Sequence, residues 1–246
     1  MIKKITFILI LFSFCFQAKA QKFITNYEEK TFNWGGKIGL NAAIPIVESI
    51  TINGIEMENI NQQYKVGYEA SIFARLNIQR FYIQPAFSWQ YTQGEIRFNI
   101  PTGSDSPSLP NGFIFQNEGT PNLITYKAAT LVVPVMIGYY IIKEGPFALS
   151  LMLGPNLKYN YKTHYSTNLT DQARKFEDDN TPFGLGLATG VGVSIGRLFF
   201  DFNYEFGLNE VVSDFYEIGK NNVSSDNLLR IEKRTNTMSF SLGFLF

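Results

Sequence analysis

Hydrophobic and polar residues alternate with a period of two along seven segments of the chain. Near the C-terminus, for example, Met238, Phe240, Leu242, Phe244 and Phe246 alternate with small or polar residues, and only Leu245 breaks the pattern. Because successive side chains on a strand point to opposite faces, each segment predicts a strand with one apolar and one polar face. The segments are 34–42, 66–76, 81–91, 147–159, 183–195, 198–208 and 237–246.

An eighth segment, residues 126–142, is apolar at nearly every position. It predicts a strand, but its alternation does not say which side chains face which side. Two further stretches, 95–100 and 112–116, flank a region rich in proline, serine and glycine. We expect them to continue the third and fourth strands as a hairpin.

The polar faces carry mostly glycine, serine, asparagine and alanine and few charges, as a crowded barrel interior requires. The apolar faces end in aromatic residues, which indicates the two interfacial girdles of a membrane barrel. A soluble lipocalin-like binder, with its apolar faces inside, is the alternative. The girdle residues are Trp34, Phe81, Phe147 and Phe246 at one rim and Trp89, Tyr91, Tyr159 and Tyr204 at the other.

The connections between these segments alternate in length. Short periplasmic turns and long extracellular loops are the rule in outer-membrane barrels. Three short and four long connections need eight strands, with both termini in the periplasm. We therefore predict an all-β fold, an eight-stranded antiparallel transmembrane β-barrel. The short connections lie around 77–79, 143–146 and 196, and the long ones cover about 45–65, 95–124, 162–180 and 210–234.

The N-terminus has the three parts of a secretory signal peptide. Basic Lys3 and Lys4 precede an apolar run too short to span a bilayer, and Ala18-Lys19-Ala20 supplies small residues before a cleavage point. We expect residues 1–20 to be the signal peptide, 21–33 a short periplasmic segment and 34–246 the outer-membrane barrel domain. Cys15 would leave with the signal, so the mature chain would contain no thiol.

Charge and composition narrow the set of partners. Without the three lysines of the signal, 18 basic and 21 acidic residues remain, so no basic surface for nucleic acid is expected. Aromatic residues make up 15% of the chain. The expected partners are outer-membrane lipid and lipopolysaccharide, the barrel-insertion machinery through the last strand ending at Phe246, and a surface or secretion-system protein.

Seven charged residues fall on the polar faces and would point into the lumen. An eight-stranded barrel is only wide enough for its own side chains, so a diffusion pore is not expected. Buried charges are tolerated when they pair, which predicts a structural network of ion pairs and hydrogen bonds. The predicted lumen residues are Lys37, Glu69, Arg75, Lys158, Arg197, Asp201 and Glu205.

The sequence offers little for catalysis. Its one histidine, His164, lies near Ser166 and Asp171 at the start of a long connection. Hydrolytic barrels need such residues near the outer rim, so a lipid-modifying enzyme is a minor alternative. The acidic run Glu177–Asp179 lacks the ligand spacing of a calcium loop. We predict a protein that is not an enzyme, with no catalytic residue, cofactor or metal site.

Four stretches in order along the chain carry a resemblance to a known family. They are Trp34–Asn41, Ile83–Ser88 with Gln93-Gly94, Leu131–Tyr139 and Phe202–Asn209. These stretches resemble the PorT-like outer-membrane β-barrel family of Bacteroidetes, which would give an OmpX- or OmpA-like eight-stranded barrel. They cover the strands, about half of the chain, and leave the long connections unmatched. In that family the position of Ala86 is usually glutamate, that of Val132 is often glutamate and that of Asn203 is often arginine.

The resemblance implies a fold and a place in the cell envelope more than an activity. The family takes its name from a protein needed for type IX secretion, so it suggests an accessory secretion component. The residues themselves favour a non-enzymatic outer-membrane barrel that acts through surface-loop contacts or by bracing the envelope.

Overall fold

The computed structural model describes residues 30–52, 55–99, 122–167, 176–180, 183–209, 211–217 and 229–246. Within these ranges every regular element is a strand, and no helix is long and apolar enough to cross a membrane. The predicted signal peptide and most of the predicted periplasmic segment lie outside the described residues, as does Asp171. Their boundaries stay predictions.

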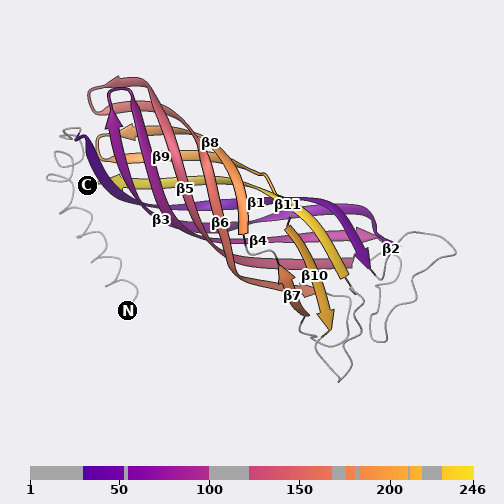
Figure 1. The fold of residues 1–246 in the computed structure, drawn as a ribbon. Coiled ribbons are helices and arrows are strands. Elements are labelled where there is room, and N and C mark those ends of the chain that lie inside the picture. Colours follow the sequence, from indigo (N-terminus) through magenta and orange to yellow (C-terminus); the bar gives the residue numbers. More distant parts are fainter. Residues whose placement is uncertain are drawn as a thin grey trace, which may run out of the picture.

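Eight antiparallel strands of the described chain form a hydrogen-bonded ring (Figure 1). The first and last strands close it through a ladder that runs from Gly35–Leu245 to Ile52–Leu229. This confirms the predicted eight-stranded fold. The ring consists of β1 (Phe32–Ile52), β3 (Glu58–Ile78), β4 (Phe81–Asn99), β5 (Asn122–Glu144), β6 (Phe147–Thr167), β8 (Phe183–Ile195), β9 (Leu198–Gly207) and β11 (Leu229–Leu245).

Three short strands extend the sheet beyond the ring at one end. The strand β2 (Ile55–Glu56) pairs with the end of β1, and β10 (Val211–Glu217) pairs with the start of β11. The strand β7 (Phe176–Asn180) pairs in turn with β10. All three lie at the end opposite the C-terminus (Figure 1).

The apolar faces point outward. Ile38 and Ile72 are each 67% exposed, whereas Tyr82 and Phe199 on the inner face are fully buried. A soluble binder would have the reverse arrangement, so the lipocalin-like alternative is wrong. Burial also shows which side chains of β5 point inward, because Val132, Met136 and Tyr140 are buried in the lumen. This strand is apolar on both faces because its part of the lumen is itself apolar.

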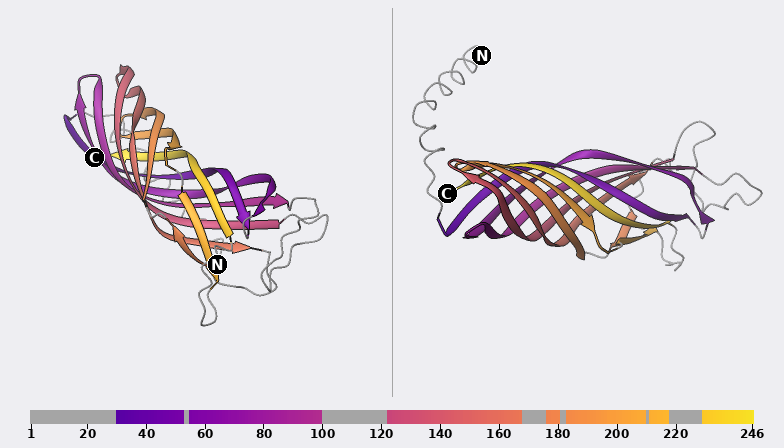
Figure 2. Two further views of the ribbon diagram at one scale, coloured as in Figure 1. Left: turned by 45° about the vertical axis from the view of Figure 1, so that its right-hand side comes forward. Right: turned by 90° about the horizontal axis from the view of Figure 1, so that it is seen from above.

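The three predicted short connections are present, and each is a turn of two residues. They are Gln79-Arg80, Gly145-Pro146 and Gly196-Arg197, and all lie at the C-terminal end of the barrel (Figure 2). Gln79, Gly145 and Gly196 have φ of 56°, 58° and 58°. Glycine adopts this left-handed conformation without a steric penalty, which explains two of the three positions.

The long connections are shorter than predicted, because the strands continue beyond the apolar belt, the band of outward-facing apolar side chains around the barrel. The expected loop 45–65 is mostly the ends of β1 and β3, with an irregularity between Val47 and Ser49. Glu95–Phe98 pairs with Asn122–Thr125, and the expected partner 112–116 lies outside the described residues. The expected loop 210–234 contains β10 and the start of β11. In these extensions the outward positions are polar, whereas inward residues such as Ile96, Phe98 and Ile124 are buried, so the apolar outer face that marks the barrel strands is missing there.

Aromatic side chains meet at both rims of the apolar belt. At the turn end, the rings of Trp34 and Phe246 stack with centroids 4.5 Å apart. At the other end, the rings of Tyr68 and Tyr91 stack at 5.0 Å. Such girdles mark the levels at which a barrel meets the two membrane interfaces.

Candidate functional site in the barrel lumen

Six of the seven predicted lumen residues lie on inward-facing strand positions. Glu69, Arg75, Asp201 and Glu205 are buried, and the side chains of Lys37 and Lys158 are 11% and 15% exposed. Arg197 differs, because it lies half-buried in the turn between β8 and β9. Six of these charged side chains thus point into the lumen, and the seventh lies at the turn end of the barrel.

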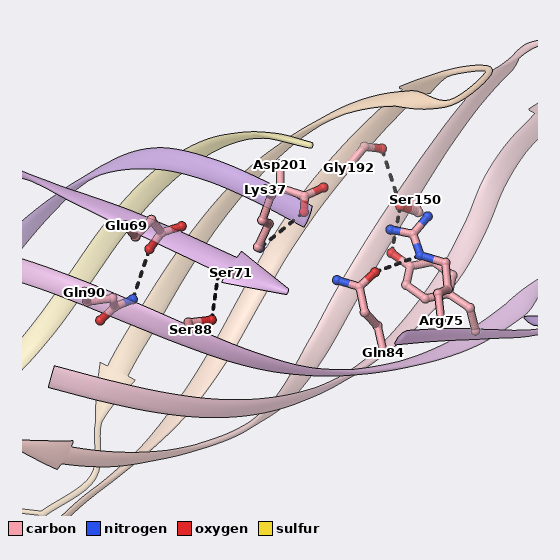
Figure 3. Close-up of polar contacts among 11 residues, drawn as sticks. Lys37, Glu69, Ser71, Arg75, Gln84, Ser88, Gln90, Ser150, Gly192 and Asp201 are labelled. Carbon is pink, nitrogen blue, oxygen red and sulfur yellow. Dashed lines mark hydrogen bonds and ion pairs between the residues drawn. The ribbon is translucent and has the colours of Figure 1, made fainter. Parts of the chain in front are cut away.

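In the middle of the lumen, polar groups from several strands meet (Figure 3). The ammonium of Lys37 on β1 lies 3.4 Å from the carboxylate of Asp201 on β9. The Gln90 amide donates to the Glu69 carboxylate at 3.0 Å. Ser71 donates to Ser88 at 2.7 Å. These contacts join β3 to its neighbour β4, and they join β1 to β9 across the intervening strand β11.

The end of the barrel opposite the short turns carries the long connections, and we call it the long-connection end. Toward this end, the Glu205 carboxylate on β9 interacts with two side chains of β6. It forms an ion pair with Lys158, and its other oxygen accepts from the Asn156 amide at 2.7 Å. The Lys158 ammonium also lies 3.4 Å from the Thr237 hydroxyl. A charged pair with additional hydrogen bonds is the arrangement that makes burial of both ions tolerable.

Toward the turn end, Arg75 lies among aromatic rings. Its guanidinium carbon is 4.5 Å from the ring centroid of Tyr82 and 5.2 Å from that of Phe199. The group also donates to Gln84 at 2.7 Å and to Tyr140 at 3.4 Å. The planar guanidinium thus satisfies its donors at its edge while its faces meet rings.

Apolar side chains pack beside Arg75. Phe73, Ala86, Phe199 and Leu245 form one buried cluster, in which the rings of Phe73 and Phe199 meet edge to face at 5.4 Å. Leu245, the residue that breaks the alternation of the last strand, therefore faces inward because this level of the lumen is apolar. We call Arg75 and these four residues the closing layer.

Glycines on neighbouring strands make room for the inward rings. A Cβ on Gly243 would lie 2.0 Å from the Phe199 ring, and one on Gly35 would lie 2.5 Å from the Phe73 ring. The glycines of β8 act similarly toward polar groups, since a Cβ on Gly190 would lie 2.2 Å from the Asn203 amide oxygen. Bulky inner side chains therefore fit a narrow barrel only opposite glycine.

The free space that remains in the lumen is small. Two adjoining cavities of about 50 Å³ and 90 Å³ share Gln90, Glu205 and Thr237 in their walls. A water molecule occupies roughly 30 Å³ in the liquid, so these spaces suit a few waters or a small ion. Ala86, Val132 and Asn203, the three departures from the resembled family, line the smaller cavity.

Sequence reasoning missed one buried cation, Lys233, which it assigned to a loop. Lys233 lies in β11, donates to the Tyr165 hydroxyl at 3.0 Å and sits 4.2 Å from the Tyr126 ring centroid. The alternation along the strand shows that Tyr82, Gln84 and Gln90 point inward. It does not show which residues they contact. Nothing in the sequence marks Lys233, because the alternation of β11 is clear only from residue 237.

The residue singled out for catalysis, His164, has no catalytic partner among the described residues. His164 is exposed and is paired in register with Lys127, and no described carboxylate or hydroxyl forms a hydrogen bond with it. Within the described ranges, no group of three histidine, cysteine or acidic side chains could hold a metal ion.

Comparison with known proteins agrees with this architecture. The outer membrane protein OprG from Pseudomonas aeruginosa has 11% identity over 89% of this chain and 97% of its own, with a TM-score of 0.51. A major outer membrane protein from Thermus thermophilus has 10% identity over 86% and 99%, with a TM-score of 0.44. No curated protein matches the chain.

At such low identity, the likeness to OprG shows a shared fold and nothing about activity. The sequence comparison is more specific, because residues 17–213, well over half of the chain, match a single family. The chain therefore belongs to the outer membrane protein β-barrel domain family.

Proposed function

We propose that this protein is a non-conducting, non-enzymatic barrel of the outer membrane that braces the envelope and makes its contacts at the long-connection end. The observation that carries the proposal is the filled lumen. Its two cavities, of about 50 Å³ and 90 Å³, are too small for a solute path. Long connections on a rigid scaffold are where contacts with other molecules are usually made.

The lumen charges support a structural role. Lys37 pairs with Asp201 and Lys158 pairs with Glu205, so two cations and two anions compensate each other. Arg75 is enclosed by rings and amide groups rather than by water. A transport path would need charged groups that face a continuous aqueous channel, whereas these groups face one another.

The orientation is part of the proposal. The three two-residue turns lie at the end of the barrel that carries the C-terminus, and the extended strands lie at the other end (Figure 2). Short turns face the periplasm in bacterial outer-membrane barrels. We therefore assign the turn end and both termini to the periplasm and the extended strands to the cell surface.

A conductance measurement tests the filled lumen. The refolded protein, inserted in planar lipid bilayers, should give no discrete current steps. The variant Phe73→Ala/Phe199→Ala, which removes both rings of the closing layer, should also give none, because the ion-paired network in the rest of the lumen remains. Insertion is checked by the heat-dependent shift on SDS gels that closed barrels often show. Stable current steps from the wild-type protein would overturn the proposal.

The alternative is an accessory role in a type IX-like secretion system, within a PorT-like group of Bacteroidetes barrels. It is supported by the four ordered stretches that resemble that family, Trp34–Asn41 being the first. Deletion of the gene followed by comparison of secreted proteins tests it. An unchanged set of secreted proteins would rule out the accessory role and leave the structural role intact.

The candidate residue for a lipid-modifying activity is His164, which is the one histidine of the sequence. Since no described acid or hydroxyl forms a hydrogen bond with this imidazole, we expect no hydrolytic chemistry there. The variant His164→Ala should leave the covalent structure of lipid A unchanged by mass spectrometry. A lost or gained acyl chain in the variant strain would make the protein an enzyme.

A further inference from the structure

Four outward-facing polar residues form a straight row across adjacent strands. Lys65 on β3 is paired in register with Gln93 on β4, which is paired with Lys127 on β5. Lys127 is paired in turn with His164 on β6. Paired residues on one face of a sheet lie about 5 Å apart, so the row is continuous across four strands.

A bulge in β6 adds a further cation. Tyr159 faces outward, and the ladder with β5 shifts between Ala129 and Thr130. Beyond the shift, Lys162 and His164 are exposed, whereas Tyr165 lines the lumen. Without the bulge, strict alternation would turn both Lys162 and His164 inward.

The row lies just above the aromatic girdle of the long-connection end. Tyr91 precedes Gln93 by two residues on the same face, and two residues span about 7 Å of a strand. Next to it, the Trp89 indole donates to the Tyr161 hydroxyl at 2.7 Å, and Tyr68 stacks on Tyr91. Since tryptophan and tyrosine mark the headgroup level, the lysines lie where lipid headgroups begin.

This patch carries an excess of positive charge. Its cations are Lys65, Arg97, Lys127 and Lys162, and Glu95 is the carboxylate that faces them, in ion pairs with Lys65 and with Arg97 at 3.7 Å. No carboxylate in the described residues forms an ion pair with Lys127 or Lys162. On the opposite wall, by contrast, Arg234 is balanced by Glu48 at 3.6 Å.

We propose that this basic patch binds the phosphate groups of lipopolysaccharide in the outer leaflet, with Lys127 and Lys162 as the main contacts. Ammonium and phosphate groups form strong charge-assisted hydrogen bonds, and His164 adds a donor beside them. The acyl chains would lie on the apolar belt below, which begins at Leu131 and Leu157. The inference rests on the orientation assigned above, because it needs the patch at the cell surface.

The test compares lipid A binding to the full-length mature protein in detergent by native mass spectrometry. The probes are bisphosphorylated lipid A and the same lipid after removal of its phosphates. Wild-type protein should prefer the phosphorylated form by about tenfold or more, and high salt should reduce this preference because it screens exposed charges. The variant Lys127→Gln/Lys162→Gln should lose the preference.

The variant Arg234→Gln is the matched control, since it removes an exposed cation from the opposite wall, and it should keep the wild-type preference. Heat-dependent gel shifts show that each variant is folded. Equal binding of both lipids by the wild type, or an undiminished preference in the double lysine variant, would overturn the inference.

A separate labelling experiment tests the assigned orientation of the barrel. A single-cysteine variant, Lys127→Cys, should react in intact cells with a maleimide that cannot cross the outer membrane. No labelling in intact cells, but labelling after lysis, would refute the orientation. Labelling in cells without any phosphate preference would refute the lipopolysaccharide site and leave the proposed structural role in place.

Discussion

Lys158 on β6 and Glu205 on β9 form an ion pair although β8 lies between their strands. The side chain that would separate them is absent, because the intervening residue is Gly186. A Cβ at this position would lie 2.7 Å from the Glu205 carboxylate. The glycine on β8 thus lets side chains of the two flanking strands, β6 and β9, meet inside the barrel.

Removing one member of this pair should destabilise the barrel more than removing both. Glu205→Ala leaves the Lys158 ammonium in the lumen without its carboxylate, and breaking a buried pair typically costs about 3 kcal/mol or more. The variant Lys158→Met/Glu205→Met should regain most of the lost stability. Urea unfolding in lipid vesicles measures the difference. A double variant as unstable as Glu205→Ala would contradict the pairing.

Gly138 should not tolerate a methyl group. A Cβ there would lie 2.0 Å from the ring of Tyr82, which is fully buried and hydrogen-bonded to Ser150 at 3.1 Å. Gly138→Ala should therefore reduce the free energy of unfolding by about 1–3 kcal/mol, the usual cost of overpacking. The control is Gly36→Ala, whose Cβ would come no closer than 3.6 Å to another atom. Equal effects of the two substitutions would show that the ring moves freely.

Lysine should not replace Arg75. It keeps the charge but cannot donate to Gln84 and lie flat against Tyr82 at the same time. A desolvated contact between a cation and a ring is worth about 2 kcal/mol. We expect Arg75→Lys to lose roughly that much stability, measured by urea unfolding, and Arg75→Ala to lose more. Wild-type stability of Arg75→Lys would mean that charge alone matters at this position.

The last residue should matter for assembly as well as stability. The Phe246 ring stacks on Trp34 at 4.5 Å, and its backbone N–H donates to the Trp34 carbonyl at 2.8 Å. Phe246→Ala should lose about 1 kcal/mol of stability in vitro. Its amount in the outer membrane should fall more than that of Phe240→Ala, which removes a ring from the middle of the same strand. Equal amounts of the two variants would argue against recognition of the terminal residue.

Cleavage of the signal peptide should leave Gln21 as the first residue of the mature protein. The prediction rests on Ala18 and Ala20 before the cleavage point. The intact mass of protein purified from the outer membrane checks it. The matched variant Ala20→Phe should accumulate as the uncleaved precursor. A mature chain that still contains Cys15 would disprove the assigned boundary.

Much of the fold was predictable because alternation along a strand is a local property. Met238 to Phe246, for example, show both the strand and its outward face without reference to any other segment. The short connections around 143–146 and 196 were equally evident, because only a few residues separate the alternating segments there. The strand ends beyond the apolar part of the barrel surface were not, since their outward faces are polar.

The sequence by itself determined the number of barrel strands and their outward apolar face. Only the tertiary structure decided which inward groups meet, because this depends on how the ring closes and on the stagger between strands that are far apart in sequence. It also decided the side on which His164 lies, since a single bulge reverses the alternation beyond it. Period-two patterning encodes facing, whereas contacts across the lumen arise only when the sheet closes on itself.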